Sequence, residues 1–218
     1  PIIYGSPKAA AYHRKALNVA GFSLNNINDA DEAHPKRINI VTCGDDNIKV
    51  ELGKSSEAAG QAAFAALEAA VRDLSDGKID AVVTAPINKK NIQSENFHFP
   101  GHTEYLEQAA QAPALMLLVA GKLRVGVVAG HVPICKVAQF ITQDKILSKL
   151  RILNKSLKQD FNIDGPRIAV LGLNPHSGDH GLLGEEEETV ISPAIAKAQE
   201  EGVCAMGPYP ADGLFGSD

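Results

Sequence analysis

The alternation of short apolar segments with longer amphipathic ones is the feature that most constrains the fold of this chain. Apolar runs at residues 79–84, 123–129 and 167–172 are bounded by glycine or proline, which is typical of buried strands in a parallel sheet. Between such runs, apolar side chains recur at helical spacing, as in the stripe from Ile146 to Leu157. Strands that alternate with helices predict an α/β fold with a mainly parallel sheet.

Local signals place the individual elements. Strands are predicted at residues 38–43, 48–52, 79–84, 114–119, 123–129, 167–172 and 203–206. Helices are predicted at residues 7–20, from a cap at Ser55 or Ser56 to Gly77, at 103–110, from Thr142 past Leu157, and at 185–201. Residues 25–37 are polar, and we expect them to be irregular.

The sequence shows no repeat and no clear linker. We therefore expect one α/β domain over residues 1–218, or two halves that share one sheet. The chain opens on Pro1 and closes on residues 213–218, which by their sequence are not expected to complete a helix or strand. We expect it to be a fragment that lacks both termini of a longer protein.

Composition and charge argue against several classes of protein. The net charge of −5 favours neither nucleic acid nor an anionic membrane as a partner. The longest nearly uncharged apolar run, residues 112–121, is too short to span a bilayer, and the first residues do not look like a signal peptide. Three widely spaced cysteines indicate neither a disulfide framework nor a thiolate zinc site. We expect a cytoplasmic protein with reduced thiols.

Two histidines follow apolar strands in matching positions. His131 comes after residues 124–130, and His176 comes after residues 168–175. Ligands of open α/β sheets bind beyond the carboxyl ends of the strands, and imidazole is a common metal ligand. A catalytic metal usually has three protein ligands, so the pair by itself is an incomplete site. The alternative is that each imidazole only bonds to the backbone of its own loop.

Two further segments precede or begin a predicted helix. Lys89 follows the strand at 79–84 and could meet a phosphate or carboxylate, or could be an ordinary exposed lysine. Thr103 is a good N-cap for the helix that it opens, and together with His102 it would make that helix N-terminus an anion site. A simple cap explains Thr103 but leaves His102 unexplained.

The loop from Asn174 to Gly178 and the segment around Asp212 are the remaining candidates. The glycine-rich loop could let nucleotide phosphates approach the backbone, but residues 185–188 are acidic and would repel a phosphate. The loop matches neither G-x-G-x-x-G nor a P-loop. Asp212 could be a general base or a carboxylate behind a metal ligand, or an ordinary turn residue.

Taken together, five motifs resemble one enzyme family. Each motif is weak alone, but they occur in order over nearly the whole chain: TAPINK at 84–89, FPGHTE at 99–104, HVP at 131–133, GLNPHSG at 172–178 and GPYPAD at 207–212. This series is similar to 4-hydroxythreonine-4-phosphate dehydrogenase, a family of pyridoxal phosphate biosynthesis.

The resemblance implies a fold, an assembly and a set of site residues. The fold would be the α/β/α sandwich of isocitrate and isopropylmalate dehydrogenases, in a homodimer with active sites at the subunit interface. His131 and His176 match two of the family's three metal ligands, and His102 and Thr103 match residues that bind the substrate. Asp212 is then a carboxylate near the metal, and Lys89 is a polar partner for substrate or cofactor; these two are the catalytic candidates. The cofactor would be bound at Asn174 and Gly178.

The implied reaction is the NAD- or NADP-dependent oxidation of a phosphorylated hydroxy amino acid, 4-phosphooxy-L-threonine. A divalent metal (zinc, magnesium or cobalt) would polarise the alcohol, and the β-keto acid formed would lose carbon dioxide to give 3-amino-2-oxopropyl phosphate. The alternatives are a dehydrogenase for other four-carbon acid phosphates, such as threonate or erythronate 4-phosphate, a metallohydrolase that uses the same histidines, and a non-catalytic binding protein.

The family's third metal histidine falls beyond residue 218. We therefore predict that the 218-residue chain binds metal weakly and shows no dehydrogenase turnover by itself. The measurement is NADH absorbance with purified chain, substrate and metal. NADH production at ordinary enzyme rates would contradict the prediction.

Overall fold

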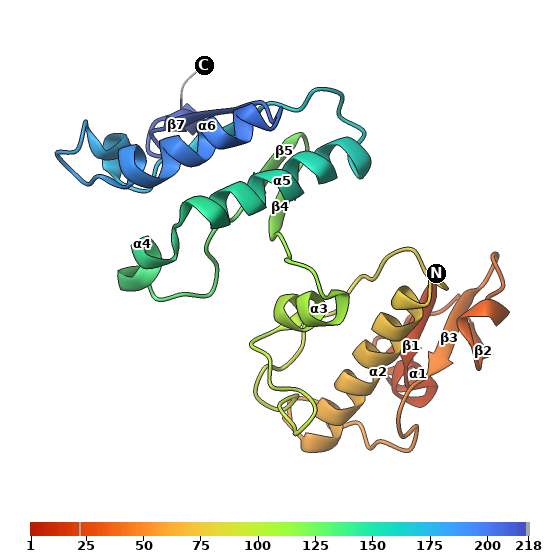
Figure 1. Cartoon of the computed structure of the whole chain (residues 1–218). Helices are drawn as coiled ribbons and strands as arrows, with labels where there is room; N and C mark the ends of the chain where they lie inside the picture. The colour runs from red at the N-terminus through yellow and green to blue at the C-terminus, as the bar shows by residue number, and fades with distance from the viewer. Residues whose placement is uncertain (22, 217–218) are drawn as a thin grey trace. The chain divides into compact units, whose positions relative to one another are not determined.

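The chain forms two compact units, Pro1–Ala114 and Leu115–Asp218. This architecture comes from a computed structural model, which describes residues 1–21 and 23–216. Figure 1 shows the elements of each unit along the chain. Each unit has its own strands, helices and apolar clusters, so each is described by itself.

A three-stranded parallel sheet organises the first unit. Strand β1 (Ile2–Gly5) leads into helix α1 (Pro7–Ala16), which the hydroxyl of Ser6 caps. Strands β2 (Leu24–Ile27) and β3 (Ile38–Thr42) follow, with the 3₁₀ turn Ala30–Glu32 between them. The strand order is β1-β3-β2, so β3 is central and its residues are the most buried.

Two apolar clusters hold the helices of the first unit. Helix α2 (Glu57–Ser75) packs against β1, and Ile27, Val41 and Cys43 of the sheet region contact its alanine-rich face. The second cluster is aromatic and joins α2 to helix α3 (His102–Ala110) through the side chains of Phe64, Phe97, Phe99 and Tyr105. The aromatic cluster thus packs α3 against α2.

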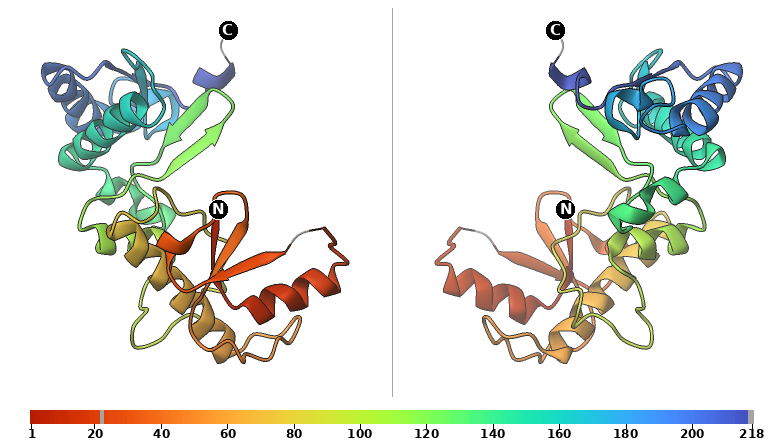
Figure 2. Two further views of the ribbon diagram at one scale, coloured as in Figure 1. Left: turned by 90° about the vertical axis from the view of Figure 1, so that its right-hand side faces the viewer. Right: turned by 90° about the vertical axis from the view of Figure 1, so that its left-hand side faces the viewer.

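The second unit contains an antiparallel hairpin and a parallel strand pair. Strands β4 (Leu117–Ala120) and β5 (Leu123–Gly126) form the hairpin, which is the green pair of arrows in Figure 2. Its turn contains Gly121 at a φ of 54°, a left-handed conformation that glycine adopts without steric cost. Strands β6 (Ile168–Leu171) and β7 (Ala205–Tyr209) pair in parallel.

Helices α5 (Gln143–Gln159) and α6 (Ser192–Glu200) cover the β6–β7 pair. The buried side chains of α5 are Ile146, Leu147, Leu150 and Leu157. They pack with Ile195 of α6 and Ile168 of β6 in one cluster. The remaining helical turns of this unit are Ile134–Lys136, α4 (Val137–Phe140), Pro175–Gly178, the π-helical turn Glu187–Ile191 and Leu214–Gly216.

The predicted α/β class with mainly parallel pairing is confirmed. The predicted caps are also found, since Ser56 accepts a hydrogen bond from the amide of Ala59 and Thr142 accepts one from the amide of Lys145. The apolar stripe predicted for α5 faces the core. Among the described residues, no helix is both long and apolar enough to cross a bilayer.

Two predicted strands are wrong. Residues 48–52 and 79–84 adopt no strand in the structure, and Val83 is 98% exposed. A strand needs a neighbour to satisfy its backbone groups, and neither segment pairs with another described strand. An apolar composition is therefore not sufficient to make either segment a strand.

Within the first 40 residues, the structure contains two strands that the sequence does not predict. The sequence does not predict strand β1, and Leu24–Ile27 lies partly inside the segment expected to be irregular. Both are short strands at the two edges of the sheet, where β3 supplies all their pairing. Helix α1 also ends at Ala16, earlier than the predicted end at residue 20.

Asn39 is the buried polar centre of the first unit, with 1% exposure. Its Nδ2 donates to the carbonyls of Pro1, His34 and Arg37, and its Oδ1 accepts from the amide of His34 and from Asn25 Nδ2. Asn39→Leu keeps the volume but leaves these groups unpaired. We expect the variant to lose about 3 kcal/mol of its free energy of unfolding, as measured by urea titration.

The matched control for that variant is Asn26→Leu, an exposed position in β2. We expect it to change the free energy of unfolding by less than about 0.5 kcal/mol. Equal effects of the two substitutions would show that the Asn39 bonds add nothing to stability.

Tyr4 gives the first unit a dependence on alkaline pH. Burial, and then the hydrogen bond of 2.7 Å from its hydroxyl to Asp73 Oδ2, raise the pKa of Tyr4 far above its ordinary value. A pKa raised by folding stabilises the protein fully below the unfolded value, near about 10, and the stabilisation is lost as pH rises above it. We expect the midpoint of urea unfolding to decrease as the pH is raised above about 10, and to decrease less steeply in Tyr4→Phe. Tyr12→Phe, at an exposed tyrosine, should decline as the wild type does.

Candidate active site

The imidazole of His176 and the carboxylate of Asp212 lie in direct contact beyond the carboxyl end of β6. The distance from His176 Nδ1 to Asp212 Oδ2 is 2.8 Å, and the two side chains are 71% and 45% exposed. When Nδ1 carries a proton, it donates to the carboxylate and leaves the lone pair of Nε2 available. Such an imidazole can accept a proton or ligate a metal ion.

The backbone that carries His176 is unusual. The residue lies in the turn Pro175–Gly178, and its φ of 53° is left-handed, unlike the backbone of a regular helical turn. A left-handed non-glycine residue is disfavoured sterically and persists only where surrounding structure fixes it. The chain keeps a positive φ over six consecutive residues: His176, Ser177, Gly178, Asp179, His180 and Gly181.

His131 occupies a similar backbone state. It lies in the exposed turn that follows β5, with a φ of 56°. Both strand-end histidines therefore adopt left-handed backbone, as residues at functional turns often do. The strand ends at Gly126, earlier than the predicted end at residue 129, so His131 is further from the sheet than expected.

The predicted metal site is not complete in the structure. Within residues 1–21 and 23–216, no three or more His, Cys, Asp and Glu side chains gather where they could hold a metal ion. His176 and Asp212 together supply fewer ligands than the three of a usual catalytic zinc site. These residues alone do not fit a divalent metal.

Glu187 lies beneath the loop that carries His176, and sequence analysis missed it. Its carboxylate is buried, with 3% exposure, and it accepts hydrogen bonds from the amides of Leu173 and Asn174 and from the side chain of Asn174. Burial opposes the ionised form, but these bonds outweigh it and hold the pKa of Glu187 below its usual value. The sequence shows only an acidic run at 185–188.

The two residues predicted to bind the cofactor, Asn174 and Gly178, both contact Glu187. The Nδ2 of Asn174 donates to Glu187 at 2.9 Å and to Glu186 at 2.7 Å. Gly178 is buried, and a Cβ built on it would lie 2.8 Å from Glu187 Oε2. The structure thus gives both residues a packing role, and their role toward a cofactor stays a prediction.

In the first unit, Lys89 and the start of α3 come together. Helix α3 begins at His102 with Gly101 as its N-cap, so the prediction that Thr103 caps the helix is wrong. A Cβ built on Gly101 would lie 3.9 Å from Lys89 Nζ and 3.6 Å from Glu104 Oε2. A helix N-terminus beside an ammonium group favours an anion, although the carboxylate of Glu104 reduces the local positive charge.

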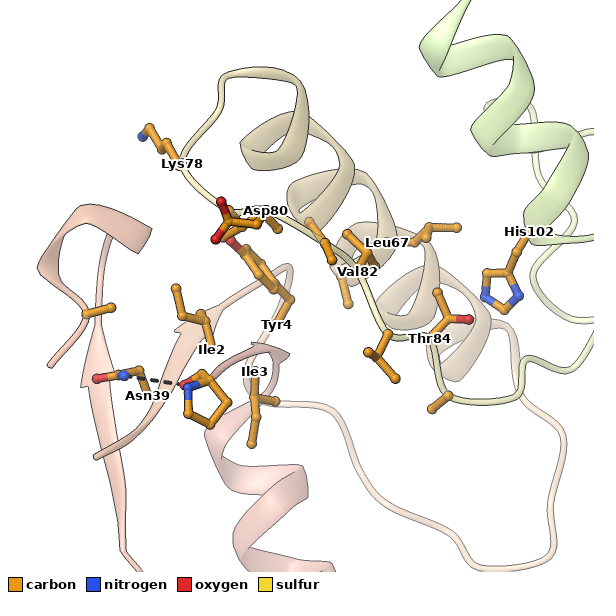
Figure 3. A pocket seen from close by; sticks show the side chains of 18 of the residues that line it. Ile2, Ile3, Tyr4, Asn39, Leu67, Lys78, Asp80, Val82, Thr84 and His102 are labelled. Atoms are coloured by element: carbon orange, nitrogen blue, oxygen red, sulfur yellow. Dashed lines mark hydrogen bonds between the residues drawn. The ribbon is translucent and has the colours of Figure 1, made fainter. Parts of the chain in front are cut away.

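His102 also borders a groove of about 780 Å³ in the first unit. The groove runs between β1, α2 and residues 78–87, a segment that includes the wrongly predicted strand at 79–84. In Figure 3, His102 lies at the end of the groove nearest Thr84, while Tyr4 lies toward the other end. The imidazole of His102 therefore faces open space and not the aromatic cluster behind α3.

Comparisons with known proteins give a consistent result. The profile of the family described as pyridoxal phosphate biosynthetic protein PdxA matches residues 1–218. The 4-hydroxythreonine-4-phosphate dehydrogenase of Bacteroides thetaiotaomicron is 53% identical over 220 aligned residues, which cover 100% of this chain and 60% of that protein. The chain thus spans about 60% of the length of this relative.

Two solved structures are similar as well. The crystal structure of 4-hydroxythreonine-4-phosphate dehydrogenase from Klebsiella pneumoniae matches with a TM-score of 0.85 and 30% identity, over 98% of this chain and 66% of that one. A terephthalate 1,2-cis-dihydrodiol dehydrogenase from Burkholderia xenovorans matches with a TM-score of 0.65 and 25% identity, over 99% of this chain and 67% of that one.

Proposed function

Because the chain belongs to the family of the pyridoxal phosphate biosynthetic protein PdxA, we propose that the protein is a 4-hydroxythreonine-4-phosphate dehydrogenase. The reaction is the NAD-dependent oxidation of 4-phosphooxy-L-threonine, followed by loss of carbon dioxide to give 3-amino-2-oxopropyl phosphate. The observation that carries the proposal is 53% identity along the whole chain with a relative of that name.

The substrate of this reaction is an anion, and the first unit offers groups that suit one. Lys89 lies beside the N-terminus of α3, where His102 and Thr103 stand in the first turn. Ammonium, imidazole and hydroxyl groups can all donate hydrogen bonds to a phosphate or carboxylate. We assign these three residues to substrate binding.

The second unit offers a group that can hold a proton. The His176–Asp212 pair orients an exposed imidazole whose Nε2 can take the proton that the alcohol loses on oxidation. NAD or NADP would accept the hydride, and Asn174 and Gly178 remain the residues proposed for its site. The resemblance alone makes His131 and His176 proposed metal ligands. An Nε2 that ligated a metal ion could not also take this proton, and we route no chemical step through a metal ion.

Two further features of the proposal concern the assembly and the location. A homodimer, isologous and closed, would be the usual way for such an enzyme to complete an interfacial site. A cytoplasmic location agrees with the three cysteines, none of which is paired in a disulfide among the described residues.

The test compares Lys89→Ala with Lys90→Ala in an enzyme of the relatives' full length, with 4-phosphooxy-L-threonine and NAD. Both lysines are exposed and adjacent, but Lys89 lies beside α3. Loss of a charge-assisted bond of about 1.5–3 kcal/mol predicts a fall in kcat/KM of about tenfold or more for Lys89→Ala, and none for Lys90→Ala. NADH absorbance is the measurement. No NADH from the wild type would reject the proposed function, and equal kinetics of the two variants would reject the role of Lys89.

A second candidate function is a dehydrogenase for other four-carbon acid phosphates. The match to a protein named as a dihydrodiol dehydrogenase indicates that a similar fold can serve the oxidation of a different alcohol. Threonate and erythronate 4-phosphates lack the amino group of the proposed substrate. A higher kcat/KM with either of them than with 4-phosphooxy-L-threonine would favour this candidate.

A further inference from the structure

We propose that Glu187 is a positioning residue that fixes the backbone of residues 172–178 and thereby places the imidazole of His176 beside Asp212. Its effect on turnover rests on the proposed function, whereas its effect on the loop does not. Among the described residues, Glu187 makes no hydrogen bond or ion pair with His176 or Asp212, so it acts through the backbone between them.

The carboxylate of Glu187 gathers the amide groups at the start of the loop. Its Oε1 accepts from the backbone N–H groups of Leu173 and Asn174, each at 2.7 Å. Its Oε2 accepts from Asn174 Nδ2 at 2.9 Å. Hydrogen bonds to an ionised acceptor are the stronger kind, and burial of the carboxylate makes them costly to lose.

The same carboxylate also lies close to Gly172 and Gly178, the two glycines on either side of His176. A Cβ on Gly172 would lie 3.1 Å from Oε1, and a Cβ on Gly178 would lie 2.8 Å from Oε2. At Gly178 the backbone thus approaches Glu187 more closely than a residue with a side chain allows, and at Gly172 a side chain would crowd the carboxylate. His176 is held between these two points of contact.

The loop needs such an anchor because its backbone is disfavoured. Six consecutive residues from His176 to Gly181 have positive φ, and four of them are not glycine. The backbone hydrogen bonds at the start of the turn are long, such as the 3.2 Å bond from the amide of Ser177 to the carbonyl of Asn174. Contacts from outside the turn, such as the bonds of Glu187 at its start, therefore help to keep this conformation.

The arrangement favours a carboxylate over a neutral amide. Both oxygens of Glu187 face donors, so the amide of a glutamine would point its NH₂ group at the NH₂ group of Asn174 or at backbone amides. The Glu186 carboxylate also accepts from Asn174 Nδ2, at 2.7 Å. It helps to orient that side chain, whereas the bonds to the loop backbone come from Glu187.

The test uses Glu187→Gln, with Glu188→Gln as the matched control. Glu188 is the exposed neighbour, and within the described part of the chain its side chain makes no hydrogen bond or ion pair. NMR of the 218-residue chain measures amide exchange at Leu173 and Asn174 and the ring ¹⁵N shifts of His176. We expect Glu187→Gln to speed exchange at both amides at least tenfold and to shift the His176 ring signals. Glu188→Gln should leave them at wild-type values.

Unchanged exchange and ring signals in Glu187→Gln would overturn the proposal, as would equal changes in Glu188→Gln. One measurement needs no variant: rapid, unprotected exchange of both amides in the wild-type chain would also overturn it. This measurement decides the case if Glu187→Gln does not fold.

Steady-state kinetics of the full-length enzyme distinguish a positioning role of Glu187 from a general loss of structure. We expect Glu187→Gln to lower kcat at least tenfold while KM for 4-phosphooxy-L-threonine changes less than twofold, because the residues assigned to the substrate lie on another unit. An unchanged kcat would overturn the role of Glu187. If the wild-type enzyme forms no NADH, the proposed function fails, and the NMR result still decides whether Glu187 fixes the loop.

Discussion

The buried carboxylate of Glu187 is the interaction on which the strand-end site depends. A parallel strand delivers its last residue to the sheet edge, but it does not determine how the chain turns afterwards. Here the turn after β6 takes a left-handed path through His176, and the amides of Leu173 and Asn174 are tied to one carboxylate from the π-helical turn Glu187–Ile191. Without that tie the imidazole would have no fixed place beside Asp212.

In the first unit, a neutral side chain holds irregular backbone in place. Asn39 sits in the central strand β3 and bonds the backbone at Pro1, His34 and Arg37. Its amide supplies donors and an acceptor at once, so it can satisfy carbonyls and an amide together. In both units a buried polar side chain forms hydrogen bonds with irregular backbone next to a short parallel sheet. Asn39 faces carbonyl groups as well as an amide, so a side-chain amide suits that position, whereas Glu187 faces only donors, so a carboxylate suits it.

Several candidate site residues stand out in the sequence because the patterns that mark them are local. His176 and His131 stand out by following apolar runs, and Asp212 by its place in a proline- and glycine-bounded segment. The pairing of His176 with Asp212 requires β6 and β7 to lie side by side, which the sequence only implies. Glu187 could not be found in this way, since a buried anchor and a solvated acidic run have the same composition. A glycine on each side of an Asn-Pro-His segment is the one available signal.

The sequence by itself determined the α/β class, the helix caps at Ser56 and Thr142, and the apolar face of α5, because periodicity and capping act within a few residues. Tertiary structure alone decided which apolar segments became strands: Ile2–Gly5 and Leu24–Ile27 found a partner in β3, while residues 79–84 did not. It also decided that Glu187, one member of the acidic run after the loop, is buried against the loop backbone. Strand pairing and buried hydrogen bonds join residues that are distant in sequence, and no local pattern specifies them.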